Sequence, residues 1–502
     1  MRKTSLFGRE LLTLCYQKNN CIMDKFFLRA CAVACLMMFS AFSLYSCGGE
    51  DEPGPDPTKK TGKDLQAISI TSSENEGLAE NSIGVISGNL VYLTVPDNVA
   101  GQKLVPTISI SEGAVAAIDG VTLEKGMAVD LLDAQNLVVT AEDGSTKTYA
   151  MLVKTGNPKM DALVYKFMTD YSIPAIALTI CKDEEVVYSC GYGYGDGTAR
   201  DRATDKHLFR LASLSKQFTS AAIMKLVEEG RLSLSSRVFG KGGVLEEEFG
   251  ADITGLPAAV TVQDLLQHAS GWISDPEDPM FPGLSNSPYW GMTTKERIDY
   301  VLHNVAQTST PGQSYSYYNL GYGMLGMVIE KVSGMDYESY LKENIWGPAG
   351  ITDMHVGGDL AHRRENEVIY TSQDGGDGYS NDMEMLKAAG GLIGSSSELA
   401  RFLCSMDYGT KVPDILKPET LDLIYTPSRA NNQYGLGWNL NHTIFTDWRG
   451  YHSGALAGTA TMWSVGNNGV NGVLLCNSRS FTKPNFDTDM YVLLHDLEQF
   501  YK

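Results

Sequence analysis

The sequence predicts an α+β fold, in which helices and a helical subdomain flank an antiparallel sheet, preceded by a small β-sandwich. Residues 63–155 show short alternating apolar stretches separated by Gly, Asn and Asp, a pattern typical of a β-sandwich. Beyond residue 156, helical and strand patterns mix, and strand patterns return in the last hundred residues. We therefore expect the first and last segments of the larger domain to share one sheet around a helical insertion.

The N-terminal residues predict a secretory signal peptide over residues 1–46. Lys25 and Arg29 precede an apolar run of about sixteen residues, which is shorter than the roughly 20 that a membrane span needs. The run ends in Leu-Tyr-Ser-Cys, which resembles a bacterial lipobox, so we expect lipidation at Cys47. Translation could start at Met1 or at Met23.

Residues 47–62 are rich in Gly, Pro and acidic side chains and predict a flexible tether. The acidic residues directly after Cys47 resemble the surface-export signal of lipoproteins in the Bacteroidota. We expect a cell-envelope protein that the lipid on Cys47 anchors to the outer membrane, with the cell surface as one location. Residues 1–46 carry six basic and two acidic groups, so the rest of the chain has a formal net charge of −24. Such an acidic chain lacks the basic patch that nucleic acid requires.

Residues 63–155 predict the β-sandwich through five recognisable apolar stretches. The expected strands are 65–70, 90–95 and 104–110, followed by a hairpin of 137–141 and 148–153 around Asp143-Gly144. This segment resembles the immunoglobulin-like spacer modules of lipoproteins. Binding of a glycan or a protein is the alternative to a spacer role.

Residues 156–502 form the second predicted domain, which begins near Gly156-Asn157-Pro158. Helices are expected at 160–171, 213–229 and 490–501, and late strands at 459–465 and 472–476. An early hairpin turns at Asp183-Glu184, with Cys181 opposite Val186 and Cys190 opposite Ala177. The two cysteines would then lie about 13 Å apart, too far for a disulfide, so we expect free, buried thiols. No Cys/His spacing indicates a metal site, and we expect no cofactor.

Ser213 and Lys216 stand where an apolar helical pattern begins, and side chains three apart share one face of a helix. A serine hydroxyl needs a base within reach, and a lysine can serve if burial lowers its pKa from about 10.4. Ser215 would face the opposite way. The same spacing also occurs at Ser339–Lys342 and Ser480–Lys483, so it does not identify the site alone.

Two further motifs follow in order: Tyr317-Tyr318-Asn319 and His452-Ser453-Gly454. With them, residues 158–500 resemble the class C β-lactamase and DD-peptidase family, which carries Ser-x-x-Lys, Tyr-x-Asn and Lys-Thr-Gly or His-x-Gly. The matches extend to the stretches 265–271, 389–392 and 434–438. The resemblance implies a β-lactamase/transpeptidase-like domain and a penicillin-binding-protein-like serine hydrolase.

The resemblance also implies a role for each matching residue. Ser213 is the acylated nucleophile, Lys216 and Tyr317 transfer protons, and Asn319 bonds the substrate amide and Lys216. A tyrosine acts as a base only where cations stabilise its phenolate, and Lys216 and His452 would supply them. The third motif binds substrate through Ser453, Gly454 and Ala455, and the N–H groups of Ser213 and Ala455 form an oxyanion hole.

Three other tyrosines and one histidine are expected to stay outside the chemistry. Tyr379-Ser380-Asn381 also fits Tyr-x-Asn, but it lies in a Gly/Asp-rich loop without the Pro-Gly lead-in. Tyr315 and Tyr318 are expected to pack, and His268 is expected to be structural.

The third motif bears on the substrate. A lysine there would hold a substrate carboxylate, whereas a histidine is often neutral. His-x-Gly resembles the DD-peptidases, D-amino-acid peptidases and esterases of the family. We expect hydrolysis of small esters, amides or D-amino-acid peptides through an acyl-enzyme. The alternatives are a true β-lactamase and a catalytically silent binding lipoprotein. The chain has no Gly-x-Ser-x-Gly, which argues against an α/β-hydrolase.

Overall fold

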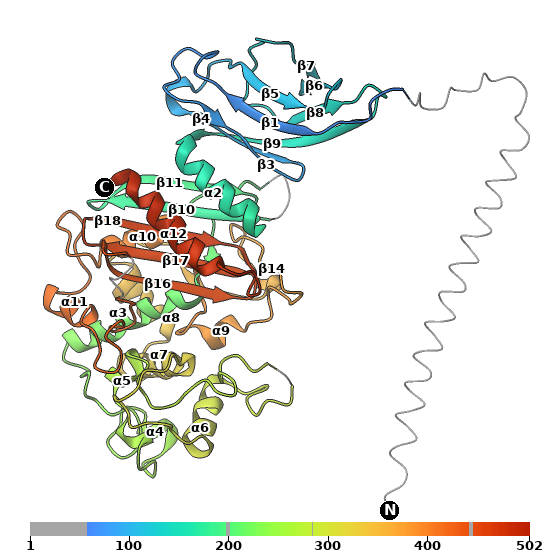
Figure 1. The fold of residues 1–502 in the computed structure, drawn as a ribbon. Helices are drawn as coiled ribbons and strands as arrows, with labels where there is room; N and C mark the ends of the chain where they lie inside the picture. Colours follow the sequence, from blue (N-terminus) through green and yellow to red (C-terminus); the bar gives the residue numbers. More distant parts are fainter. Residues whose placement is uncertain (1–57, 197–200, 284, 441–444) are drawn as a thin grey trace, which may run out of the picture. The chain divides into compact units, whose positions relative to one another are not determined.

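The computed structural model describes residues 58–196, 201–283, 285–440 and 445–502 (Figure 1). The predicted signal peptide, Cys47 and most of the tether lie outside these residues. Within the described part of the chain, no helix is both long and apolar enough to cross a membrane. Residues 58–62 belong to a small unit with residues 141–145, in which the Lys60 amide donates to Glu142 and the Asp143 amide donates to the Lys60 carbonyl.

The N-terminal strands form two sheets around a shared apolar cluster. The three-stranded sheet has the order β2-β1-β5, with β1 Leu65–Ile70, β2 Ser82–Ile83 and β5 Pro106–Ile110. The six-stranded sheet has the order β3-β4-β9-β8-β6-β7, with β3 Val85–Ser87, β4 Leu90–Pro96, β6 Val115–Ile118, β7 Val121–Thr122, β8 Asn136–Thr140 and β9 Thr146–Gly156. The strands predicted at 65–70 and 90–95 and the late hairpin are confirmed. The parallel pairing of β4 with β9 is a feature that alternation alone does not predict.

The larger part of the chain is organised around a five-stranded antiparallel sheet of order β11-β10-β18-β17-β16 (Figure 1). Its strands are β10 Ala175–Lys182, β11 Glu185–Gly193, β16 Trp448–Leu456, β17 Thr459–Gly466 and β18 Val470–Cys476. Two strands come from the start of this segment and three from its end. The prediction that the first and last segments share a sheet is therefore confirmed.

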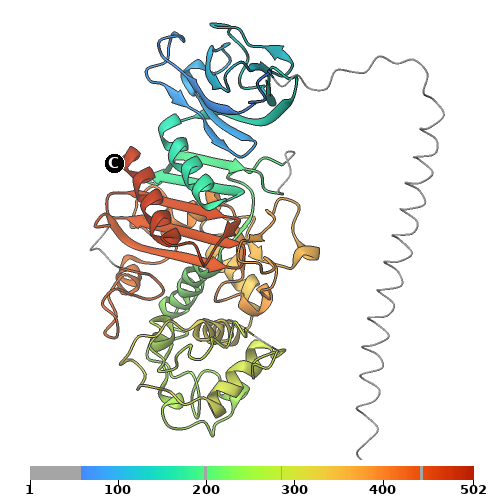
Figure 2. The same ribbon diagram turned by 45° about the vertical axis from the view of Figure 1, so that its right-hand side comes forward.

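Helices cover both faces of this sheet, and the side chains of β10 alternate between two apolar clusters. Ile176, Leu178 and Ile180 pack with α2 (Pro158–Tyr171) and α12 (Phe486–Glu498), which lie together along the sheet in Figures 1 and 2. Ala177 and Cys181 pack in the other cluster, with α3 (Ser215–Glu228) and α10 (Ser396–Cys404). α2 begins at Pro158 because the Asn157 side chain accepts the amides of residues 159 and 160.

A helical region is inserted between the early and late strands (Figure 2, green and yellow). Its helices are α4 Glu246–Phe249, α5 Val262–Leu266, α6 Thr294–Asn304, α7 Asn319–Ser333 and α8 Tyr337–Leu341. Two small sheets join it to the rest: β12 (Phe209–Arg210) with β15 (Leu392–Gly394) and β13 (His355–Val356), and β14 (Thr371–Ser372) with β19 (Ser478–Arg479). The short helices α9 Met383–Leu386 and α11 Pro418–Ile424 complete the α-helices of the described residues.

The β10–β11 hairpin corrects one detail of the predicted register. Cys181 pairs with Val186 as predicted, but Cys190 pairs with Leu178 rather than with Ala177. A bulge after Ile180 shifts the register by one residue, and alternation in the sequence does not reveal it. Both cysteines are free thiols, and Cys190 is half-buried rather than buried.

Candidate active site

Ser213 lies in a tight turn between β12 and α3. The residue before it, Ala212, has a φ of 49°, in the left-handed region that favours glycine and costs other residues about 1 kcal/mol or more. Ser213 belongs to a single 3-10 turn, η2 (Ala212–Leu214), and α3 begins at Ser215, two residues later than predicted. Ser213 is half-buried while its neighbours Ala212 and Leu214 are fully buried, so its hydroxyl stays accessible.

Strand β16 passes close beside this turn, and Gly454 makes the approach possible. A Cβ atom at Gly454 would lie 2.3 Å from Thr461 Oγ1 and 2.5 Å from the Leu211 carbonyl oxygen. The Thr461 hydroxyl donates to that carbonyl at 2.8 Å and fastens the turn to the sheet. A side chain at position 454 would therefore push the strand away from Ser213.

The buried ammonium of Lys216 is held by three oxygen atoms. Nζ lies 3.0 Å from Ser213 Oγ, 2.8 Å from Asn319 Oδ1 and 2.5 Å from the Ala389 carbonyl oxygen. Burial lowers the pKa of Lys216 to about 7, against the opposing effect of the Asp278 charge. A neutral Lys216 donates its two hydrogens to the two carbonyl oxygens, and its lone pair then faces the Ser213 hydroxyl. This geometry suits a general base.

Tyr317 completes the group around the Ser213 hydroxyl. Its hydroxyl donates to Ser213 Oγ at 2.8 Å. Burial raises the pKa of Tyr317 well above its usual value of 10, so the side chain is a protonated phenol in the resting protein. Of the two side chains, Lys216 is thus the one that can accept a proton near neutral pH, and Tyr317 is the one that can donate a proton.

Asn319 is the first residue of α7, and its side chain bonds both Lys216 and Asp278. Its Oδ1 accepts from Lys216, while its Nδ2 and backbone amide donate to Asp278 Oδ2 at 2.9 and 3.3 Å. Sequence reasoning missed Asp278. It is one of three acidic residues in a short stretch with Asp275 and Glu277, and the sequence does not distinguish among them.

His452 lies beside this group, but it is neutral. Its Nδ1 donates to its own strand at the Ser453 carbonyl, 2.7 Å away, so Nε2 accepts from the Tyr434 hydroxyl at 3.3 Å. Burial, and then the Lys216 charge, lower the pKa of His452 to about 3. The prediction that His452 supplies a cation for a Tyr317 phenolate is therefore wrong.

Ser453 contributes no side chain to the site. Successive residues of a strand face opposite sides of the sheet, and the Ser453 hydroxyl accepts from Tyr491 of α12 at 2.8 Å. His452 and Gly454 face the Ser213 side instead. The oxyanion hole of the Ser213 and Ala455 amides stays a prediction.

Residues 160–497 match the sequence profile of the family described as Beta-lactamase. The chain belongs to the beta-lactamase family.

Two curated relatives of comparable similarity come from Escherichia coli and Bacillus subtilis. A putative D-alanyl-D-alanine carboxypeptidase of Escherichia coli K12 is 25% identical over 307 residues, which are 54% of this chain and 69% of that protein. Penicillin-binding protein 4* of Bacillus subtilis is 27% identical over 306 residues, or 55% of this chain and 62% of that protein.

The fold of the family is also evident in a solved class C beta-lactamase structure. It superposes with a TM-score of 0.56 over 68% of this chain and 95% of that one. At 16% identity this likeness concerns the fold alone. The predicted β-lactamase-like α+β domain is confirmed.

The other matches to the family motifs lie elsewhere, as predicted. Tyr379 packs its ring 4.7 Å from the Arg210 guanidinium and 5.5 Å from the Tyr370 ring. Lys342 pairs with Glu338, and Lys483 donates to the Asp170 carbonyl. None of these contacts involves Ser213 or Lys216.

His268 is buried, and its ring packs against that of Tyr317. Its Nδ1 accepts the Tyr318 amide at 3.1 Å, and its ring centroid lies 4.2 Å from that of Tyr317. Burial lowers the pKa of His268 well below 6.5, so it is neutral. The contacts agree with the expected structural role.

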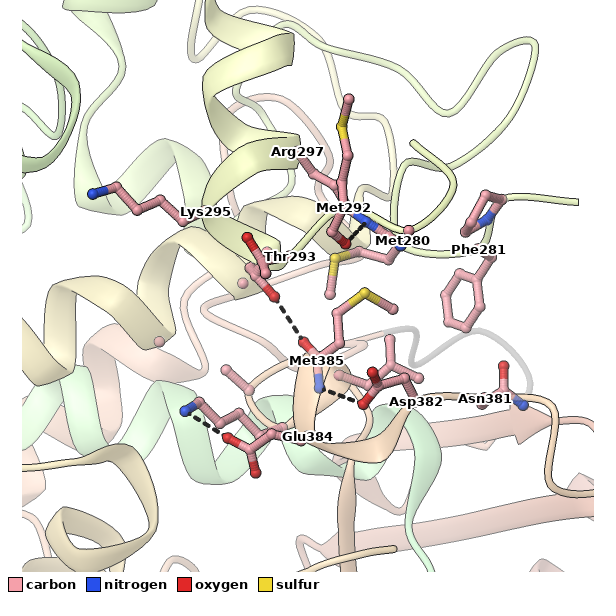
Figure 3. Close-up of a pocket in the computed structure, with 18 of the residues that line it drawn as sticks. Met280, Phe281, Met292, Thr293, Lys295, Arg297, Asn381, Asp382, Glu384 and Met385 are labelled. Atoms are coloured by element: carbon pink, nitrogen blue, oxygen red, sulfur yellow. Dashed lines mark hydrogen bonds and ion pairs between the residues drawn. The ribbon is translucent and has the colours of Figure 1, made fainter. Parts of the chain in front are cut away.

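A cavity of about 980 Å³ lies along α7, between residues 280–297 and residues 380–388 (Figure 3). Its lining includes Met280, Met292, Met327 and Met385. Residues of α7, the helix that begins with Asn319, form part of its lining, but Ser213, Lys216 and Tyr317 do not line it. Among the described residues, no group of three or more His, Cys, Asp or Glu side chains could hold a metal ion.

Proposed function

We propose that this protein hydrolyses small esters, amides or D-amino-acid peptides through an acyl-Ser213 intermediate. The observation that supports it most is the position of Lys216. A buried amine with a pKa of about 7 lies 3.0 Å from Ser213 Oγ, and two carbonyl oxygens fix its direction. A binding protein without catalysis has no physical need for such a group.

In the proposed acylation, neutral Lys216 takes the Ser213 proton as Oγ bonds to the substrate carbonyl carbon. The oxyanion that forms accepts the amides of Ser213 and Ala455. Tyr317 protonates the leaving alcohol or amine as the carbonyl-to-leaving-group bond breaks. The proton on Lys216 then neutralises the Tyr317 phenolate. Water attacks the acyl ester by the reverse route and releases the acid and free Ser213.

The neutral His452 bears on the choice of substrate. A β-lactam carries a carboxylate, and a fixed cation at the third motif would hold it. With a pKa of about 3, His452 offers no positive charge near neutral pH. We therefore place neutral esters and amides ahead of β-lactams. The similarity to a putative D-alanyl-D-alanine carboxypeptidase and to a penicillin-binding protein keeps D-alanyl peptides and penicillins among the candidates.

The test is incubation of the protein with a fluorescent penicillin and, separately, with a nitrophenyl ester, followed by intact mass measurement. The proposal predicts turnover of the ester through a transient acyl adduct. Rapid hydrolysis of the penicillin instead would indicate a β-lactamase. A protein that forms no adduct and turns over neither compound would contradict the proposal and indicate a silent binding protein.

We also propose that the lipid on Cys47 anchors the protein to the outer membrane, with residues 63–155 as a spacer. The lipobox-like sequence and the acidic tether support this location. Cys47→Ala should leave protein that takes up no labelled fatty acid and no longer fractionates with membranes. Labelled fatty acid in the variant would contradict the assignment.

A further inference from the structure

Asp278 stands directly behind Asn319 and is surrounded by hydrogen-bond donors. Its Oδ2 accepts from Asn319 Nδ2 at 2.9 Å, from the Asn319 amide at 3.3 Å and from the Ser274 hydroxyl at 3.0 Å. Its Oδ1 accepts from the Met280 amide at 2.9 Å. The carboxylate also lies at the N-terminus of α7, where a negative charge is favoured.

These contacts determine which way the Asn319 amide points. A carboxylate accepts hydrogen bonds but donates none, so it selects the orientation with Nδ2 toward Asp278. The carbonyl oxygen of Asn319 must then face Lys216. In the reversed orientation, Oδ1 would face the carboxylate and Nδ2 would face the Lys216 hydrogens. Both contacts would be repulsive.

We propose that Asp278 is a positioning residue, which fixes the Asn319 amide with its oxygen toward Lys216 and so aims the base at Ser213. The inference rests on the proposed role of Lys216. Asp278 acts through Asn319 and does not itself touch the substrate. Its charge has a second consequence, because it favours the protonated form of Lys216 and opposes the effect of burial.

The other titratable groups facing Lys216 are neutral among the described residues. Tyr317 precedes α7 and Tyr322 lies on it; their rings are 4.9 and 5.5 Å from Nζ, and the pKa of each is raised. His268 follows α5 and His452 lies on β16, and both have lowered pKa values. Asp278 is thus the ionised group whose removal should move the titration of Lys216.

The experiment compares Asp278→Asn with Asp275→Asn, which removes the same charge from an exposed position in the same loop. An asparagine at 278 places its NH2 group against donors in either orientation, so the Asn319 amide loses its fixed direction. We expect kcat/KM for a nitrophenyl ester to fall about 10- to 100-fold in Asp278→Asn. We expect the Asp275→Asn control to stay within about twofold of the wild type.

A double-mutant cycle separates this role from general support of the fold. If Asp278 acts through Asn319, then Asp278→Asn should lower kcat/KM by less than about threefold in a protein that already carries Asn319→Ala. An equal loss in both backgrounds would overturn the proposal.

A second readout needs no substrate. In protein labelled with ¹³C at the lysine ε-carbons, the Lys216 resonance is assigned by its absence in Lys216→Met. The pH midpoint of the titration of this resonance should drop by about half a pH unit or more in Asp278→Asn and stay unchanged in Asp275→Asn. An unmoved midpoint in Asp278→Asn would contradict the inference. If the wild type turned over no ester, the proposed function would fail, while this titration would still decide the role of Asp278.

Discussion

Burial of Lys216 should set the pH range in which the protein acylates. With a pKa of about 7, half of the Lys216 side chains are neutral at pH 7. About one-tenth are neutral at pH 6 and about nine-tenths at pH 8. At the ordinary lysine value of 10.5, only about one in three thousand would be neutral at pH 7. We therefore expect kcat/KM for a neutral ester to rise about tenfold from pH 6 to pH 8.

The assay is hydrolysis of nitrophenyl acetate, followed at the wavelength where nitrophenol and nitrophenolate absorb equally. The rate of the Ser213→Ala variant is subtracted at each pH to remove hydrolysis that does not use the nucleophile. The substrate carries no group that titrates in this range, so the profile reports the free protein. Lys216→Arg is the matched variant, because an arginine stays charged and cannot act as a base.

Two results would refute this reasoning. A flat profile, or a rise centred near pH 10, would mean that burial does not tune Lys216. A rise near pH 7 that persists in Lys216→Arg would belong to another group.

His452→Gln should lower the rate but keep the rise near pH 7, because the His452 imidazole titrates at about pH 3. Loss of the rise in that variant would make His452 the base.

Three further substitutions test two positions near Ser213 and one buried carboxyl at the end of α12. Ser215→Ala should still acylate, but it leaves the buried Leu392 amide without its acceptor and should lose about 1–3 kcal/mol in a denaturant melt; loss of acylation would move the site to Ser215. Gly454→Ala forces a Cβ to within 2.3 Å of Thr461 Oγ1, so kcat/KM should fall about 100-fold or more with the circular dichroism spectrum preserved, and full activity would disprove the close approach. Glu498→Gln tests a buried carboxyl whose pKa is raised to about 7 by burial, from 4.5. The raised pKa means that the wild type loses stability as pH rises from about 4.5 to 7, so the advantage of the variant should grow by about 2–3 kcal/mol between pH 5 and pH 8, and a constant difference would contradict the pKa.

Part of the group around Ser213 could be predicted from spacing, because side chains three apart share one face of a helical turn, which brings Lys216 to Ser213. The expectation that Tyr317 and Asn319 lie at the same place rests on the resemblance to the class C β-lactamase and DD-peptidase family. The five-stranded sheet was predictable because strand-like apolar stretches occur both at the start and at the end of the larger domain. These inferences need only local patterns and a shared fold.

Other features could not be predicted, because they depend on how deeply a side chain is buried and on contacts between segments that are far apart in the sequence. The left-handed turn at Ala212 has no local signal, because alanine does not favour it. The neutral state of His452 follows from its burial beside Lys216, which spacing cannot reveal. Asp278 resembles its acidic neighbours until the loop is placed against α7. The orientation of Ser453, by contrast, could have been predicted. Alternate residues of a strand face opposite sides of the sheet, so Ser453 must face away from the side that His452 and Gly454 share.

The acylation site itself is the most direct test of the account. The protein is incubated with a slowly deacylating activity probe, digested, and mapped by mass spectrometry. The account predicts one probe adduct, on Ser213, which is absent from Ser213→Ala and greatly reduced in Lys216→Arg. An adduct on any other residue, or unchanged labelling of Ser213→Ala, would contradict it.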